Sequence, residues 1–238
     1  MNAEVTKKVK EAKDTYSFYL KPEKNINFSP GQFIYVTLPE LKYSDKRGST
    51  RHFTVASSPT EKQLMFTTRI RQSSGYKRTL IELKKDDIVE INGPNGTFIV
   101  DEKEEGPHIF IAGGIGITPF MSILGYKIKK GLKYKATLLY SNTSKDTTAF
   151  EKELTKFADK DKYLNVFHTI TRETPKNWKG LKGRVDKKML QDILLLKDIP
   201  LSHFWISGPP AMVDSMEKEV ENLGVNPDNI RVDKFSGY

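Results

Sequence analysis

Short stretches of alternating hydrophobic and polar residues, separated by turns, run through roughly the first 100 residues. Residues 64–71 show the pattern most clearly, with Leu64, Phe66, Thr68 and Ile70 on one side of a two-residue period, which is typical of a strand. Further strand-forming stretches lie at 15–20, 32–38 and 87–91, with one helical stretch at 76–84. Many short strands with a single helix predict a small all-β barrel.

From residue 108 onward the pattern changes to apolar strands alternating with helices. The predicted strands lie at 108–112, 136–141, 163–170 and 203–207, and the predicted helices near 118–130, 148–158, 186–195 and 210–223. This alternation predicts a parallel sheet wound with helices. The change falls in the charged stretch 101–107. We therefore expect two domains, an all-β barrel at 1–103 and an α/β parallel-sheet domain at 104–238.

Composition narrows the range of functions. The 238 residues suit two domains, and the formal net charge of +9 favours an acidic protein partner or a solvated lysine-rich surface. The basic residues form no stripe with interleaved aromatic residues, so we expect no nucleic-acid partner. The chain has no cysteine, which excludes disulfides, zinc–thiolate sites and iron–sulfur clusters held by this chain, and we expect no metal. With no apolar run of about 20 residues and no signal-peptide core, we expect a cytoplasmic, monomeric protein without a membrane span.

The segment 109–124 combines an apolar strand, a glycine turn and the start of a helix at Thr118-Pro119. This geometry brings backbone N–H groups and a positive helix end up to a phosphate. The turn contains Gly113, Gly114 and Gly116, but Pro119 stands where the G-x-G-x-x-G fingerprint has its third glycine. The glycine spacing alone leaves open both phosphate binding and a tight turn without a ligand.

Three companion motifs accompany this segment: Pro30-Gly31-Gln32-Phe33, then Arg51-His52-Phe53-Thr54 with Ser57-Ser58-Pro59, and finally Ser207-Gly208-Pro209-Pro210-Ala211-Met212. Together they resemble the ferredoxin–NADP reductase superfamily over residues 30–238. The resemblance implies a flavin-binding barrel, a nucleotide-binding α/β domain, and FAD with NADP or NAD as cofactors. It also implies transfer of a hydride from NAD(P)H to flavin N5, followed by single electrons to an acceptor.

The resemblance assigns the flavin to one strand and its neighbours. Arg51 would pair with the pyrophosphate, which suits a permanently charged, bidentate guanidinium. Phe53 would pack on the isoalloxazine in place of the usual Tyr, without a hydroxyl for the ribityl chain, and Thr54 would bond near N5. The other residues implied to bind flavin are His52, Thr68, Arg69, Ile70, Ser74, Gly75, Lys77 and Thr79. Whether Lys77 or Thr79 meets the phosphate stays open.

The same resemblance assigns the pyridine nucleotide to the second domain. Its pyrophosphate would lie on Gly113, Gly114, Ile115, Gly116, Thr118 and Pro119. Ser207 takes the place of the family's Cys near nicotinamide C4, followed by Gly208 and Pro209. Arg172 and Arg184 match a pair that holds the 2′-phosphate in NADPH-using members, so NADPH is favoured. The loop around Trp178 resembles NADH-using oxygenase reductases and leaves NADH open.

The end of the chain offers two aromatic candidates for the flavin face, Phe235 and Tyr238, against the alternative of a frayed tail. Thr54, Ser207 and Tyr238 are the candidate catalytic residues. Because the chain contains no iron–sulfur or haem domain of its own, the predicted acceptor is a separate, acidic carrier such as ferredoxin or flavodoxin. The alternatives are reduction of free flavin, and an electron-transfer subunit within a larger complex.

Overall fold

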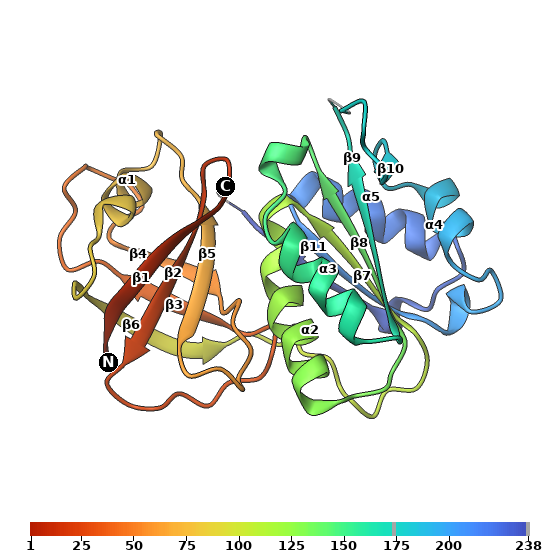
Figure 1. Cartoon of the computed structure of the whole chain (residues 1–238), viewed down its shortest axis with the longest axis horizontal. Helices are drawn as coiled ribbons and strands as arrows, with labels where there is room; N and C mark the ends of the chain where they lie inside the picture. Colours follow the sequence, from red (N-terminus) through yellow and green to blue (C-terminus); the bar gives the residue numbers. More distant parts are fainter. Residues whose placement is uncertain (173–174, 237–238) are drawn as a thin grey trace.

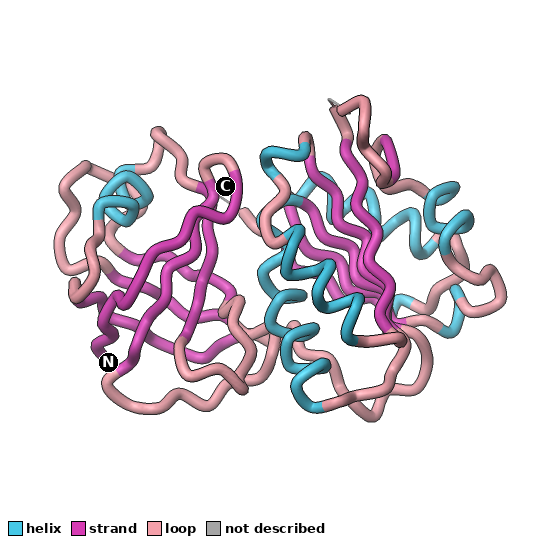
Figure 2. Tube along the Cα trace, viewed as in Figure 1, coloured by secondary structure: helices cyan, strands magenta, loops and turns pink. Residues whose placement is uncertain are grey.

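Two six-stranded sheets divide the chain in the computed structural model, which describes residues 1–172 and 175–236. The first sheet is antiparallel and occupies the N-terminal half. The second is parallel and carries helices on both faces (Figures 1 and 2). This confirms the predicted fold class, a barrel-like antiparallel sheet followed by an α/β parallel sheet.

The antiparallel sheet has the strand order β4-β3-β6-β1-β2-β5. Its strands are β1 (Asn2–Ala12), β2 (Thr15–Pro22), β3 (Phe33–Thr37), β4 (Thr50–Thr54), β5 (Leu64–Arg69) and β6 (Ile88–Asn95), with one helix, α1 (Gly75–Glu82). The inward positions of the strands stack aromatic rings: Phe66 lies 5.2 Å from Phe18 and 4.5 Å from Phe53 between ring centroids. These rings form part of the core beneath the flavin motif of the sequence.

Strand β1 was not predicted as a separate element, because charged residues are frequent along it and its apolar residues are few and small. Only Ala3 and Val5 are buried, and the strand forms a hairpin with β2 that runs from the pair Ala3–Pro22 to the pair Ala12–Thr15. The strand is held by backbone hydrogen bonds to β2 and β6 rather than by an apolar face. Because these two neighbouring strands stabilise β1, it forms without the alternation of apolar and polar side chains by which a strand is predicted from sequence.

The parallel sheet has the order β10-β9-β8-β7-β11-β12. Its strands are β7 (His108–Gly113), β8 (Ala136–Asn142), β9 (Leu164–Ile170), β10 (Leu181–Lys182), β11 (His203–Gly208) and β12 (Ile230–Lys234). Its helices are α2 (Thr118–Lys130), α3 (Glu151–Lys160), α4 (Lys187–Ile193) and α5 (Pro210–Glu221), with 3-10 turns η1 (Gly114–Ile117), η2 (Lys145–Thr147), η3 (Ile199–Leu201) and η4 (Pro227–Asn229). Strands β10 and β12 at the two edges were not predicted. Because β7 lies between β8 and β11, the strand order reverses beside β7, where α/β sheets bind ligands at the carboxyl ends of their strands.

The two halves are packed against each other on the α2 face of the parallel sheet. Phe98, which follows β6, is 8% exposed and lies 5.2 Å from Trp205 and 5.8 Å from Phe120 between ring centroids. The buried hydroxyl of Ser122 in α2 donates to the carbonyl oxygen of Ser57 at 2.7 Å. The carboxyl end of the parallel sheet is thereby fixed beside the barrel. None of the described helices is long and apolar enough to cross a membrane.

Candidate functional site

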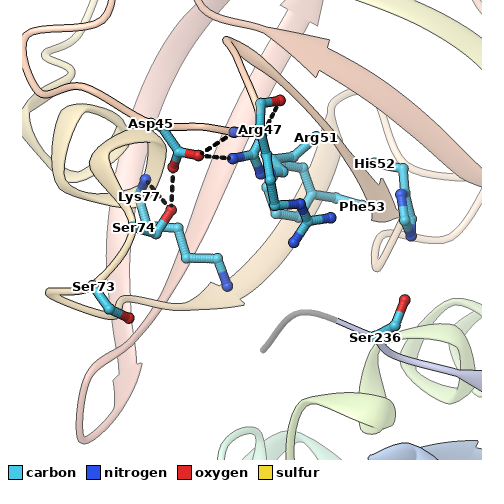
Figure 3. Close-up of a pocket in the computed structure, with 9 residues that line it drawn as sticks. All are labelled: Asp45, Arg47, Arg51, His52, Phe53, Ser73, Ser74, Lys77 and Ser236. Carbon is cyan, nitrogen blue, oxygen red and sulfur yellow. Dashed lines mark hydrogen bonds and ion pairs between the residues drawn. The ribbon is translucent and has the colours of Figure 1, made fainter.

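A pocket of about 180 Å³ opens on the barrel beside the N-terminus of α1 (Figure 3). Its lining residues come from the loop before β4, from β4, from the start of α1 and from the C-terminal segment: Asp45, Arg47, Arg51, His52, Phe53, Ser73, Ser74, Lys77 and Ser236. Three of them are cationic, and one carries a carboxylate. The motif around Arg51 and the loop around Ser74, which are separate in sequence, therefore meet in one pocket.

Asp45 is the centre of the hydrogen-bond network on this wall. Its carboxylate accepts from Arg51 Nη2 at 2.6 Å, and from the Arg47 N–H, the Ser74 hydroxyl and the Tyr76 N–H at 2.9 Å each. Burial alone would raise the pKa of Asp45, but the bonds from Tyr76, Arg47 and Ser74 and the Arg51 charge hold it well below its usual range. The carboxylate thus satisfies a free N–H in the first turn of α1, where an anion is favoured.

Arg51 is largely engaged by the protein itself. Besides the bond to Asp45, its Nη1 donates to the carbonyl oxygens of Arg47, Gly48 and Thr50 at 2.9, 2.9 and 2.7 Å. The side chain is 9% exposed. Arg51 therefore fixes the loop that carries Arg47, whose exposed guanidinium points into the pocket (Figure 3).

Lys77 also lines this pocket, on the first turn of α1, and is 4% exposed. Burial lowers its pKa to about 7, helped by the charges of Arg71, Arg51, Arg47 and Arg69.

Thr79 is not among the residues that line the pocket. Whether it contacts the phosphate stays a prediction. Two positions along a helix turn a side chain by about 200°. The Thr79 hydroxyl donates instead to the Gly75 carbonyl oxygen at 2.9 Å, inside the helix. Of the two open candidates, the structure brings Lys77 to the pocket.

The other residues expected to bind flavin lie on β4, on β5 and just beyond β5. Phe53 faces the barrel interior, 2% exposed and stacked on Phe66 at 4.5 Å, whereas His52 is exposed. Thr54 and Thr68 are 7% and 0% exposed, and the Thr68 hydroxyl has no hydrogen-bond partner among the described residues. Ile70, just beyond β5, is held by a backbone bond to Asp14 at 2.7 Å. Packing of Phe53 on the isoalloxazine and bonding of Thr54 near N5 stay predictions.

A second pocket, of about 360 Å³, lies at the carboxyl ends of the parallel strands. Polar and apolar residues both line it: Arg69, Gly113, Gly114, Ser141, Asn142, Thr143, Thr171, Arg184, Val185, Pro209, Ala211, Met212, Ser215 and Met216. The glycine segment and the segment after β11 meet here, as their positions at the switch of strand order imply.

The glycine turn is built for close approach. A Cβ on Gly116 would lie 2.3 Å from the Ser207 carbonyl oxygen, so η1 can pack on β11 only with glycine there. Gly114 has φ +53°, and a Cβ on it would meet no atom within 4 Å, which leaves open space in front of the turn. Thr118 bonds back to Ile115 at 3.2 Å, ahead of Pro119 in the first turn of α2.

Ser207 lies near the carboxyl end of β11, but it is not among the residues that line this pocket. The Ser207 side chain is 0% exposed, and its hydroxyl has no hydrogen-bond partner among the described residues. The Phe235 N–H donates to the Gly208 carbonyl oxygen at 2.9 Å, which ties the C-terminal segment to β11. Tyr238 lies outside the described residues.

Of the two arginines expected at the 2′-phosphate, Arg184 lines the pocket and Arg172 does not. Arg172 is exposed, and its backbone N–H bonds to Thr143 at 3.1 Å. Sequence reasoning did not predict Asp45, Arg47 or Asn142. The rule that ligands bind at strand carboxyl ends could have found Asn142 at the end of β8.

Comparison with known proteins identifies both halves. The oxidoreductase FAD-binding domain model matches residues 2–99, and the oxidoreductase NAD-binding domain model matches residues 110–218. The sulfhydrogenase 1 subunit gamma of Pyrococcus furiosus is 31% identical over 210 residues, which are 86% of this chain and 67% of that protein. The chain belongs to the ferredoxin–NADP reductase superfamily. It carries an oxidoreductase FAD-binding domain followed by an oxidoreductase NAD-binding domain.

Other relatives and solved structures agree with this assignment. A flavohemoprotein of Oceanobacillus iheyensis is 26% identical over 97% of this chain, which spans 58% of that relative's length. A cytochrome P450 reductase of Amycolatopsis superposes with a TM-score of 0.85 at 21% identity, covering 99% of this chain and 70% of that one. A ferredoxin NADP⁺ reductase of Neisseria gonorrhoeae, solved with FAD and NADP bound, gives 0.83 at 18% identity, covering 98% of both. These structures share the fold of this member of the superfamily.

The residues present fit both cofactors of the superfamily. The barrel pocket offers the side chains of Arg47 and Lys77 to a pyrophosphate. The second pocket offers the open space in front of Gly114. The hydroxyls of Thr68 and Ser207 have no hydrogen-bond partner among the described residues, but neither residue lines one of the two pockets.

Proposed function

We propose that this protein is an FAD-dependent reductase that uses NADPH in preference to NADH and passes electrons to a separate, acidic carrier protein such as ferredoxin or flavodoxin. One observation carries the proposal. Ser236 lines the pocket of the barrel, and the N–H of the preceding Phe235 bonds to the carbonyl oxygen of Gly208, next to Pro209 in the lining of the pocket of the parallel sheet. The two pockets are therefore neighbours, as transfer between a nicotinamide and a flavin requires.

In the barrel pocket, Arg47 and Lys77 would contact the FAD pyrophosphate, and Arg51 would orient Arg47 through the loop that it holds. His52, Ser74 and Gly75 would border the same ligand, with Thr54 and Thr68 toward the flavin ring. When bound, FAD supplies the capacity to accept two electrons as a hydride and to release them one at a time. The chain's own residues then act by binding, orientation and exclusion of water.

In the second pocket, the glycine turn would hold the coenzyme pyrophosphate, and Ser207 with Gly208 and Pro209 would border the nicotinamide. Arg184 supports the NADPH preference, since a guanidinium lining the pocket favours the 2′-phosphate, whereas an acidic residue would favour the ribose hydroxyls of NADH. Arg172 would add charge from outside the lining.

The net charge of +9 supports an acidic acceptor. A second candidate, an electron-transfer subunit of a larger complex, is favoured by the 31% identity to a sulfhydrogenase subunit. Reduction of free flavin is the third. The boundary after residue 103, a monomeric state and a cytoplasmic location stay predictions.

The visible spectrum of the purified protein tests the proposal. We expect a yellow protein that releases FAD rather than FMN on denaturation. Its flavin absorption should bleach without oxygen on addition of NADPH, at lower concentrations than of NADH. Reduction of ferredoxin or flavodoxin should slow as salt rises, because about 0.15 M salt screens exposed charges beyond about 8 Å. A protein that binds no flavin contradicts the proposal, and a rate independent of salt contradicts an acceptor steered by charge.

A further inference from the structure

The carboxyl end of β8 places a buried amide in the pocket of the parallel sheet. Asn142 is 5% exposed and lines this pocket. Its backbone belongs to the sheet, where its carbonyl oxygen accepts from the Thr171 N–H at 2.9 Å. Neither its side-chain oxygen nor its side-chain nitrogen has a hydrogen-bond partner among the described residues. A buried amide without partners is costly, so a ligand that enters the pocket can supply the missing hydrogen bond.

Tyr140 lies on the same face of β8, two residues before this amide. It is 0% exposed, in the core that contains α2 and Phe98. Burial raises the pKa of Tyr140, and the neighbouring Asn142 amide acts in the opposite direction, as do the Ala149 N–H and the Arg69 charge. An amide has two donor hydrogens and two acceptor lone pairs. Contact with one hydroxyl therefore still leaves Asn142 with N–H groups to offer to a ligand.

The charges that line this pocket favour an anion. Arg69 comes from β5 of the barrel and Arg184 from the segment after β10, and no carboxylate is found among the described residues of the lining. Phosphate oxygens accept hydrogen bonds and carry the negative charge that the two guanidinium groups favour. A phosphate is therefore the group that best suits both the arginines and the free N–H groups of Asn142.

The register of the sheet places Asn142 beside the glycine turn. Ser141 pairs with Gly113 in the parallel ladder of β8 and β7, so Asn142 ends β8 where Gly114 begins the turn after β7. The space in front of Gly114 is open, because a Cβ there would meet no atom within 4 Å. Adjacent strands are about 4.8 Å apart. A phosphate bound at the turn would therefore have Asn142 as its neighbour.

We propose that the side-chain amide of Asn142 donates a hydrogen bond to the pyrophosphate of the pyridine nucleotide, in the pocket that Arg69 and Arg184 also line. The inference rests on the proposed coenzyme site at the glycine turn, and it adds a residue that binds the part common to NADPH and NADH. Asn142 thus complements Arg184. The amide contributes to the affinity for both coenzymes, whereas the guanidinium contributes to the preference between them.

Two probes that differ only in the pyrophosphate test the contact: adenosine 2′-monophosphate and adenosine 2′-phosphate 5′-diphosphate. In calorimetric titrations of the full-length protein, Asn142→Ala should weaken binding of the diphosphate probe by about tenfold, the scale of a hydrogen bond to a charged group. Binding of the monophosphate probe should not change. Arg184→Ala should weaken both, because both probes carry the 2′-phosphate. Equal losses with the two probes in Asn142→Ala, or no loss with either, overturn the inference.

Asn142→Asp separates a donor from an acceptor. This substitution keeps the shape of the side chain, removes its N–H groups and adds a negative charge that repels a pyrophosphate. It should therefore bind the diphosphate probe more weakly than Asn142→Ala does. Binding as tight as that of the wild type would show that Asn142 accepts rather than donates, and would overturn the inference. Asn165→Ala, exposed in β9, is the matched control and should keep the wild-type affinity for both probes.

Kinetics and stability distinguish this contact from a structural role. Asn142→Ala should raise KM for NADPH and KM for NADH by the same factor, and an unchanged KM for either coenzyme overturns the inference. Asn142→Leu, similar in size but without the buried amide, should unfold at a urea concentration no lower than the wild type. A lower midpoint would show that the amide stabilises the fold instead. A wild type that binds neither probe and uses neither coenzyme would reject the coenzyme site itself, and the inference with it.

Discussion

The carboxylate of Asp45 and the guanidinium of Arg51 form an ion pair with an Oδ1–Nη2 distance of 2.6 Å, and their side chains are 7% and 9% exposed. The pair joins the loop before β4 to β4 itself, and Asp45 extends the link to α1 through Ser74 and Tyr76. It therefore builds the wall on which the flavin pocket depends. Removing one member leaves the other charge buried, which costs far more than loss of an exposed pair.

Asp45→Asn should lower the free energy of unfolding of the flavin-free protein by about 3 kcal/mol, because Arg51 loses its counter-charge. Urea denaturation at pH 7 measures this. Since the pKa of Asp45 is depressed in the folded state, the difference from wild type should be complete above about pH 4 and shrink in stronger acid. Asp86→Asn, at a carboxylate that is 70% exposed, is the control. Equal stability of Asp45→Asn and wild type would show that the pair contributes nothing.

Arg47→Ala and Arg51→Ala should separate binding from loop structure. Arg47 is exposed and points into the pocket, so its loss should weaken FAD binding by about 1.5–3 kcal/mol, the scale of a hydrogen bond to a charged group, without changing the urea midpoint. Arg51→Ala should lower both the affinity for FAD and the urea midpoint, since it also leaves three carbonyl oxygens without their donor. Lys46→Ala serves as the exposed control for both measurements. Wild-type FAD affinity in Arg47→Ala would exclude this guanidinium from the pyrophosphate site.

Arg184→Ala should raise KM for NADPH by at least tenfold and leave KM for NADH nearly unchanged, because only NADPH carries the 2′-phosphate. Arg172→Ala should also raise KM for NADPH, but by less, since Arg172 is not among the lining residues. Steady-state kinetics with both coenzymes measures this, and Lys182→Ala, exposed in β10, is the control. Equal losses with NADPH and NADH would mean that Arg184 holds a part common to both coenzymes.

His108, at the start of β7, should make stability depend on pH between 6.5 and 4. It is 0% exposed and stacked 5.3 Å from His203, and burial followed by the His203 charge lowers its pKa to about 4. As pH falls below 6.5, the unfolded chain binds a proton that the folded protein does not, so about 2 kcal/mol of stability is lost by pH 5. His108→Phe should lose that much less between pH 7 and 5 in urea denaturation. Parallel pH profiles for the two proteins would reject the assignment to His108.

The sequence predicted those parts of the fold that depend on local pattern. The helix that begins at Thr118-Pro119 follows the glycine turn as expected, because both the start signal and the apolar period are local. Strand β1 could not be predicted in this way, since it is held by backbone hydrogen bonds to β2 and β6 and its own charged side chains give no apolar pattern. The same limit applies to the site: Arg51 belongs to a recognisable motif, but its engagement by Asp45 depends on a loop folding back over α1. The choice between Lys77 and Thr79 stayed open because a stretch of sequence does not show which way a helix faces.

Two contacts between the halves affect how the protein unfolds. Ser122 donates a hydrogen bond to Ser57, and Phe98 packs against Phe120 and Trp205. Phe98 follows the last strand of the antiparallel sheet, yet it is buried in the core of the parallel half. Opening either half alone would expose this shared apolar surface, so neither half should melt independently. A calorimetric scan of the flavin-free chain should show one cooperative transition, with equal van't Hoff and calorimetric enthalpies. Phe98→Ala should be the change that splits it into two.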